Sequence, residues 1–119
     1  MELEAFDFQK LTVYQRIRSL NKVLLPFLYQ KLIQLDPYLV DQLKRASLSA
    51  ALNLAEGTGR TSSADKKRFY VMSRSSVYEC VALLDTLVDT RLISPAQFSS
   101  YLNDYTEISK MLYALYKKA

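Results

Sequence analysis

The sequence predicts an all-α protein, folded as an antiparallel up-down-up-down four-helix bundle in a single domain that spans residues 1–119. The 119 residues include only two glycines and three prolines, which leaves little room for the turns that an all-β fold needs. Apolar side chains also recur every three or four residues along four separate stretches, the pattern of one buried helix face. Four such helices with short connections pack as a bundle around one hydrophobic core.

The first eleven residues are expected to form a lead-in, and the first helix is expected over about 13–34. Thr12 and Gln15 have the spacing of a capping box. Proline inside a helix removes a backbone hydrogen bond, so we expect a kink or a break at Pro26. The inward-facing residues are predicted to be Ile17, Leu20, Leu24, Leu28, Leu32 and Leu35.

The second helix is expected over about 37–56. Asp36 is suited to the cap position and is followed by proline at the first helical position. Gly57 is predicted to end the helix in the left-handed conformation. The small residues in the middle of this helix favour close approach of a neighbour. The predicted inward residues are Leu39, Leu43, Ala46, Ala50 and Leu54.

The third and fourth helices are expected over about 63–90 and 95–117. Ser62 or Ser63 is expected to cap the third, and Ser94 and Gln97 form a capping box for the fourth. The inward residues are predicted to be Phe69, Met72, Ser76, Cys80, Leu83 and Leu87 in the third helix, and Phe98, Leu102, Tyr105, Ile108, Leu112 and Leu115 in the fourth.

Composition argues against most catalytic chemistry. The chain has no histidine, which excludes Ser-His-Asp and Cys-His nucleophile pairs and histidine metal ligands. We therefore predict no catalytic residues, no metal and no cofactor. Cys80 is alone, so no internal disulfide forms, and its apolar surroundings predict a buried, inert thiol. Because neither a membrane-spanning apolar run nor a signal-peptide pattern is present, we expect no membrane association and a cytoplasmic protein.

Basic residues concentrate in the middle of the chain. The net charge is +4, and residues 44–74 hold seven basic side chains against Glu56 and Asp65. Cations near the start of the third helix oppose its dipole, so we expect Glu56 to pair with Arg60 or Arg68. The excess of cations predicts a surface for RNA or DNA. Its predicted residues are Lys44, Arg60, Lys66, Lys67, Arg68 and Arg74, with Tyr70 as a candidate for base stacking.

A second set of polar residues shares helix faces in the central part of the chain. Residues spaced by four, four and three lie on one face of the second helix, and a pair three residues apart lies on the third. Their predicted role is a polar network that fixes how the helices or subunits pack, with a solvated face or a ligand site as alternatives. The set comprises Arg45, Ser49, Asn53, Glu56, Ser76 and Glu79.

The stretch QLKRASLSAALNLAEGTGR, followed by Arg68-Phe69 and later by a Ser-Val-Tyr-Glu run, resembles a bacterial four-helix-bundle family. Its members are encoded in intervening sequences of large-subunit ribosomal RNA genes. Ser75 departs from that pattern, because the family has glycine there. The matching positions are Gln42, Arg45, Ala46, Ser49, Asn53, Ala55, Glu56, Gly57, Arg68, Phe69, Ser76 and Glu79.

This resemblance implies a ring-like homo-oligomer, with a pentamer as the expected size, and no enzymatic activity. The chain is also similar to accessory proteins of diversity-generating retroelements, which bind nucleic acid beside a reverse transcriptase. Two functions remain open: an oligomeric accessory protein that binds RNA or DNA, and an oligomeric protein-interaction scaffold without nucleic acid. A third, an enzyme with Glu56 and Glu79 as an acid/base pair, requires those carboxylates to lie close together.

Overall fold

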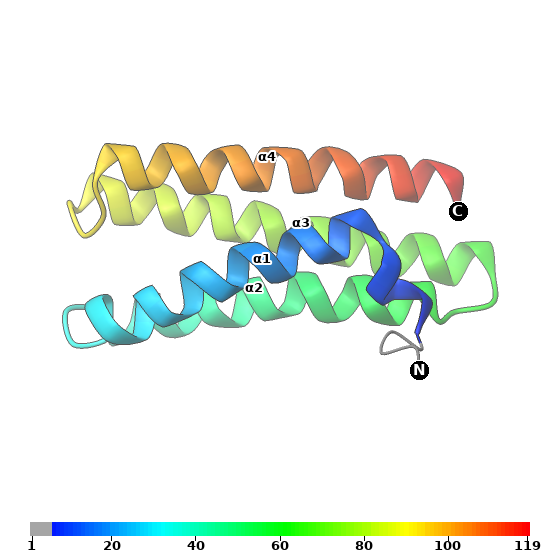
Figure 1. Cartoon of the computed structure of the whole chain (residues 1–119), viewed down its shortest axis with the longest axis horizontal. Helices are drawn as coiled ribbons and strands as arrows, with labels where there is room; N and C mark the ends of the chain where they lie inside the picture. The colour runs from blue at the N-terminus through cyan, green and yellow to red at the C-terminus, as the bar shows by residue number, and fades with distance from the viewer. Residues whose placement is uncertain (1–5) are drawn as a thin grey trace.

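The computed structural model describes residues 6–119, and throughout that range its regular structure is helical, without a strand. The prediction of an all-α protein with four long helices is therefore confirmed. In Figure 1 the chain runs along the molecule four times and reverses at each turn, an arrangement compatible with the predicted up-down-up-down bundle. The long helices are α1 (Thr12–Phe27), α2 (Pro37–Thr58), α3 (Ser63–Asp89) and α4 (Pro95–Lys118).

The start of α1 differs from its predicted capping box. Part of the predicted lead-in, residues 1–5, lies outside the described residues; Asp7–Lys10 form a short 3-10 helix, η1. Leu11 takes the cap position without a side-chain bond. The side-chain Nε2 of Gln15 donates instead to the backbone carbonyl of Gln9, at 3.1 Å. This hydrogen bond therefore ties α1 to η1, and the predicted capping box between Thr12 and Gln15 does not form.

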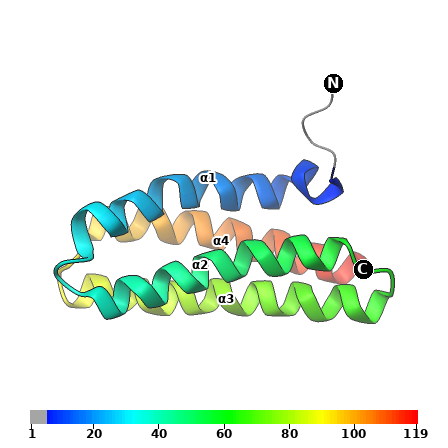
Figure 2. The same ribbon diagram turned by 90° about the horizontal axis from the view of Figure 1, so that it is seen from below.

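Pro26 does not break its helix. The helix α1 continues past Pro26 to Phe27 and leads directly into η2, a π-helical turn over Leu28–Leu32. There the amide of Ile33 donates to the carbonyl of Leu28 at 2.9 Å, across five residues. Proline lacks an amide hydrogen and crowds the turn before it, whereas this π turn follows Pro26. The predicted break at Pro26 is therefore wrong. Figure 2 shows this end of the helical path bending toward α2.

The other three predicted helix starts are confirmed. The carboxylate of Asp36 accepts the amide of Leu39 at 3.0 Å, and Ser62 Oγ accepts the amide of Asp65 at 3.1 Å. Ser94 and Gln97 form both bonds of the capping box, at 3.1 and 2.9 Å. These bonds satisfy amides that have no partner within their helix.

Gly57 does not have the predicted left-handed conformation. It lies inside α2, which ends at Thr58 with Gly59 as its cap, and no glycine of the chain has a positive φ. Its role is steric. A Cβ built on Gly57 would lie 2.8 Å from Cε1 of Tyr70 and 2.9 Å from Cβ of Phe69. Only glycine therefore allows α3 to pass α2 at this distance.

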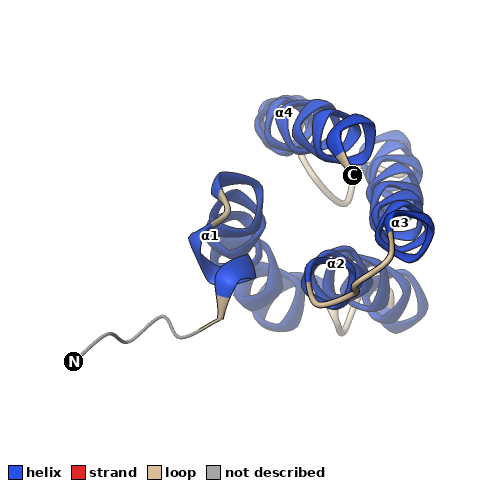
Figure 3. Ribbon diagram, turned by 90° about the vertical axis from the view of Figure 1, so that its right-hand side faces the viewer, coloured by secondary structure: helices blue, strands red, loops and turns tan. Residues whose placement is uncertain are grey.

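Most of the predicted inward residues are buried, but every helix needs a correction. Leu39 in α2, and Phe98, Leu102 and Leu115 in α4, are half-buried. Leu35, predicted to face inward, is 67% exposed because it follows the end of η2. In α3 the predicted Phe69, Cys80 and Leu87 are buried, but Ser73, Val77 and Leu84 are buried in place of the predicted Met72, Ser76 and Leu83, which are half-buried. The end-on view in Figure 3 shows α2, α3 and α4 side by side, with α1 across the core from α3. None of the described helices is long and apolar enough to cross a membrane.

Ser73 explains why the buried face of α3 differs from the predicted one. Its hydroxyl is fully buried and donates to the carbonyl of Ala50 at 2.6 Å. Ala50 and the neighbouring Ala46 are both buried in α2 and are small enough to let the two backbones come close. A serine that satisfies its hydroxyl on a neighbouring helix can occupy the core at little cost. The buried position therefore lies one residue later than predicted at 73, 77 and 84, while the other predicted positions of α3 are unchanged.

Candidate nucleic-acid interface

Four of the predicted basic residues gather at one end of the bundle, around the turn between α2 and α3. Lys66 Nζ donates to the carbonyl of Thr58 at 2.9 Å. This carbonyl belongs to the last turn of α2, where the helix dipole favours a cation. Lys66 thus opposes the dipole of its own helix but complements that of α2. The other three are Arg60, Lys67 and Arg68.

The guanidinium groups at this end stack on an aromatic ring. Arg60 and Arg68 place their Cζ atoms 4.5 and 4.7 Å from the ring centroid of Phe69, distances typical of cation–π contacts. Arg68 also lies 3.8 Å from the carboxylate of Asp65, an exposed and therefore weak pair. The predicted pairing of Glu56 with Arg60 or Arg68 is wrong for residues 6–119, where no such ion pair forms.

The C-terminal half of α4 extends this basic surface. The end of α4 lies beside the start of α3, where Ser63 Oγ donates to the carbonyl of Ala119 at 2.8 Å. Residues 66–78 of α3 and 108–119 of α4 hold seven basic residues and no Asp or Glu. We call these two segments the basic surface. Its basic residues are Lys66, Lys67, Arg68, Arg74, Lys110, Lys117 and Lys118.

Sequence reasoning missed the three lysines of α4. The predicted nucleic-acid surface came from the charge of one continuous segment, residues 44–74, whereas the basic surface joins two segments that are far apart in the chain. A detectable signal was nevertheless present. Lys110, Tyr113 and Lys117 are spaced by three and four residues, which places them on one helix face.

A groove of about 310 Å³ runs between α3 and α4 within the basic surface. Arg74 bridges its two walls. The Nε atom of Arg74 donates to Ser109 Oγ at 3.2 Å, and its Cζ lies 5.1 Å from the ring centroids of both Tyr78 and Tyr113. The lining residues are Tyr70, Val71, Arg74, Ser75, Tyr78, Tyr113 and Tyr116.

Lysines flank the same groove. Lys67 Nζ lies 5.4 Å from the ring centroid of Tyr116, and Lys117 Nζ lies 5.7 Å from that of Tyr113. The rings of Tyr113 and Tyr116 are stacked, with centroids 6.2 Å apart. The groove therefore combines aromatic planes with ammonium groups along its edges.

The predicted stacking role of Tyr70 does not fit its position. Tyr70 is buried against Gly57, and burial raises the pKa of its hydroxyl. The aromatic residues that face solvent in this groove are Tyr78 and Tyr113, which are 58% and 47% exposed. Tyr78 also lines a second groove of about 340 Å³ farther along α3 and α4, beside Lys110.

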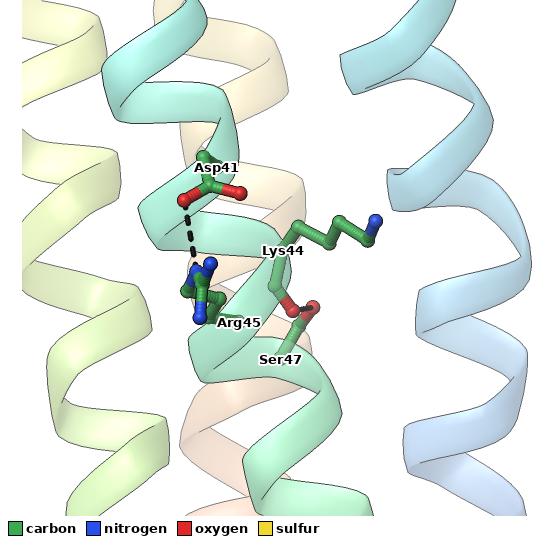
Figure 4. Close-up of polar contacts among 4 residues, drawn as sticks. All are labelled: Asp41, Lys44, Arg45 and Ser47. Atoms are coloured by element: carbon green, nitrogen blue, oxygen red, sulfur yellow. Dashed lines mark hydrogen bonds and ion pairs between the residues drawn. The ribbon is translucent and has the colours of Figure 1, made fainter.

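Lys44 lies apart from the other predicted basic residues. Its Nζ is 5.0 Å from the ring centroid of Tyr29, which belongs to η2. Figure 4 shows Lys44 on the side of α2 that faces α1, whereas Asp41 and Arg45 point away from it. Lys44 is therefore not part of the basic surface.

The predicted polar network is present only in its middle. Ser76 Oγ donates to Ser49 Oγ at 2.9 Å, and Asn53 Nδ2 donates to Ser49 Oγ at 3.0 Å. These three half-buried residues tie α2 to α3. The three charged members of the predicted set do not join them: Arg45 pairs with Asp41 at 2.8 Å, and Glu56 and Glu79 are exposed.

Glu56 and Glu79 are poorly placed for paired-carboxylate chemistry. The bond between Ser49 and Ser76 marks a common level in α2 and α3. From that level Glu56 lies seven residues along α2, and Glu79 lies three residues along α3 in the opposite direction. At 1.5 Å per residue, the two backbones are about 15 Å apart along the bundle axis. Carboxylates that share an acid/base reaction lie within about 10 Å.

Cys80 is a buried free thiol, as predicted. Burial raises its pKa to about 12, so little reactive thiolate forms near neutral pH. Within residues 6–119 no group of three His, Cys, Asp or Glu side chains is placed to hold a metal ion.

Comparison with known proteins gives one family and one solved structure of interest. A sequence model of the 23S rRNA-intervening sequence protein family matches residues 9–114. The crystal structure of a protein of unknown function from Bacteroides thetaiotaomicron, assigned to the S23 ribosomal protein family, superimposes with a TM-score of 0.82. The two chains are 27% identical, over 88% of this chain and 98% of the other. The curated proteins give no match.

Proposed function

Because the chain belongs to the family of 23S rRNA-intervening sequence proteins, we propose that it is a non-catalytic, oligomeric protein that binds RNA or DNA. The observation that carries the proposal is the basic surface, where residues 66–78 of α3 and 108–119 of α4 hold seven cations and no acidic residue, and where Arg68 alone forms an ion pair within residues 6–119, with Asp65. A surface of one sign attracts polyanions and releases their counterions on binding. The names of the matched family and of the related structure both refer to the ribosome or its RNA.

Not every cation of the basic surface has the same role. Lys66 caps α2 and Arg68 lies near Asp65, so both are partly engaged within the protein. Lys67, Lys110 and Lys117 have no ion pair within the described residues. We propose that these three make the principal phosphate contacts and that Arg74 orders the groove between them.

We further propose that the protein acts as a homo-oligomer, with the pentamer implied by its family resemblance as the expected size. A few phosphate contacts per subunit bind weakly, and joining several copies raises the overall affinity. Leu48 and Leu52 support a contact surface on α2, since Leu52 is 60% exposed. They line a cleft of about 630 Å³ between α1 and α2, on a different pair of helices from the groove. The proposed setting is the cytoplasm, with a reverse transcriptase-type enzyme as one class of partner.

The decisive test is fluorescence anisotropy of labelled single-stranded RNA and duplex DNA, titrated at several salt concentrations with protein of known oligomeric mass. We expect the logarithm of affinity to fall linearly with the logarithm of salt, with a slope that reflects several neutralised phosphates. If neither nucleic acid binds even at low salt, the proposal is wrong. The alternative, an oligomeric protein-interaction scaffold, would then be favoured.

A further inference from the structure

The groove between α3 and α4 offers more than charge. Two half-exposed tyrosines, Tyr78 and Tyr113, lie beside Arg74, whose Cζ atom is 5.1 Å from each ring centroid. Nε is the one nitrogen of Arg74 that makes a hydrogen bond within residues 6–119. A guanidinium carries five donor N–H groups. The groove therefore presents two tyrosine rings next to the hydrogen-bond donors of Arg74 that are not used within residues 6–119.

We infer that this groove holds an unpaired base of a single-stranded nucleic acid, stacked among Tyr78, Arg74 and Tyr113. The inference rests on the proposed function and adds a strand preference to it. Aromatic and guanidinium planes stack on exposed bases of any sequence. In a duplex the base faces are already stacked on each other, and a groove between two helices cannot reach them. Single strands should therefore bind more tightly than duplexes of equal length.

The size of the groove suits one base. Its volume of about 310 Å³ is at the lower end of the range for small-ligand clefts, about 300 to 1,000 Å³. The second groove, of about 340 Å³, continues along the same two helices and shares Tyr78. Successive bases of one strand can thus follow α3 and α4 from one groove to the next.

Charge selects the nucleic acid over other occupants of an aromatic groove. Lys67 and Lys117 lie 5.4 and 5.7 Å from the rings of Tyr116 and Tyr113. Lys110 lies on the Tyr113 face of α4 and lines the second groove. Within residues 66–78 and 108–119 there is no acidic side chain to neutralise these lysines. A second copy that docked through this same face would bring like charge and be repelled, and docking through a different face would change the oligomeric mass in the test below.

The test compares three probes of equal length: an unstructured pyrimidine RNA strand, the corresponding abasic strand and an RNA duplex. The variant is Tyr78→Leu/Tyr113→Leu, which keeps apolar side chains at two exposed positions. The control is Tyr38→Leu, because Tyr38 is 70% exposed near the start of α2, outside the groove. Circular dichroism and light scattering establish that each variant keeps its fold and mass.

We expect the groove variant to bind the base-containing strand about five- to 150-fold more weakly, the effect of losing stacking on one base. Its affinity for the abasic strand and the duplex should not change, and Tyr38→Leu should bind like the wild type. Equal losses for all three probes would mean that the tyrosines only position Arg74, and no loss would mean that no base stacks there. Either result overturns the inference but leaves the proposed function standing.

Two further outcomes are distinguishable. If the wild type binds none of the three probes, the proposed function fails and the inference fails with it. If the groove variant changes the oligomeric mass, the groove is a subunit contact and the inference is wrong. Intrinsic fluorescence adds an independent readout because the chain has nine tyrosines and no tryptophan. Binding of the base-containing strand should quench it more strongly in the wild type than in the groove variant.

Discussion

Tyr70 occupies the space that a side chain on Gly57 would need: a Cβ at Gly57 would lie 2.8 Å from Cε1 of the Tyr70 ring. The same Cβ would lie 2.9 Å from Cβ of Phe69, which is fixed to the α3 backbone. Distances below 3 Å between carbon atoms are strongly repulsive, and a Cβ atom cannot rotate away. The close contact between α2 and α3 at the basic end thus depends on one missing methyl group.

We predict that Gly57→Ala destabilises the protein by about 1 to 3 kcal/mol through overpacking. Alanine favours helix over glycine by about 1 kcal/mol, so a net loss would show that the steric effect is larger. Gly59→Ala is the matched control. Its Cβ would lie 3.6 Å from the nearest atom, with an ordinary φ of −80°. Urea unfolding should give Gly59→Ala a stability equal to or slightly above wild type; a stabilised Gly57→Ala variant would contradict the packing.

The basic surface gives a prediction about salt dependence. Lys67→Glu/Lys117→Glu should weaken binding to single strands and reduce the salt slope by about 1.4, since each phosphate contact contributes about 0.7. Lys31→Glu/Lys44→Glu changes the net charge equally but lies on η2 and α2, near Tyr29. If the control double variant weakens binding as much, general attraction rather than this surface determines affinity. Fluorescence anisotropy at several salt concentrations separates the two.

Tyr105 carries an unsatisfied polar group in the core. Its hydroxyl is buried and makes no hydrogen bond of ordinary geometry within the described residues; its polar neighbour is the Cys80 thiol, a weak hydrogen-bonding group. Burial also raises the pKa of Tyr105 well above its ordinary value. Because a buried, unpaired hydroxyl costs about 1 to 3 kcal/mol, Tyr105→Phe should raise the free energy of unfolding by up to that amount. A loss of stability, measured by urea unfolding with circular dichroism, would mean that the hydroxyl has a partner in solution.

Alkaline pH should destabilise the protein through Cys80. Burial raises the thiol pKa from 9.0 to about 12, so between these values the unfolded chain loses a proton that the folded chain keeps. Stability is then complete below about pH 9 and falls as pH rises toward 12. The loss at about pH 10 should be about 1 kcal/mol. Cys80→Ala should show a shallower decline over this interval in urea unfolding; an unchanged slope would exclude the thiol as the cause.

The sequence predicted the fold well wherever the relevant physics is local. Asp36, Ser62 and Ser94 cap their helices because each side chain binds an amide three residues away. Such bonds require no knowledge of neighbouring helices. The burial of Ser73 in α3 and the steric role of Gly57 instead depend on contacts between α2 and α3. Neither Ser73 nor Gly57 reveals its partner through its spacing in the chain.

The candidate site was only half predictable for a similar reason. Lys67 and Arg74 were identified from a basic run, but Lys110 and Lys117 join them through the packing of α4 on α3. Lys44 was included because it is near in sequence, although it lies on the α1 side of the bundle. Charge counted along a chain is a poor guide to charge on a surface when helices about 30 Å long run back and forth.

The cleft between α1 and α2 gives the last prediction, which concerns assembly. Leu52 is 60% exposed at the edge of this cleft, and burial of a leucine side chain contributes about 1.5 to 3 kcal/mol. Leu52→Glu should therefore lower the oligomeric mass measured by light scattering. Leu35→Glu makes the same change at a leucine that is 67% exposed just before α2, away from the cleft, so its mass should equal that of wild type.

An unchanged mass for Leu52→Glu would place the subunit contact elsewhere, and a monomeric wild type would refute the proposed oligomer. Because Leu52 lies outside the groove between α3 and α4, a dissociated variant should still bind single strands, but more weakly, through the loss of multivalency.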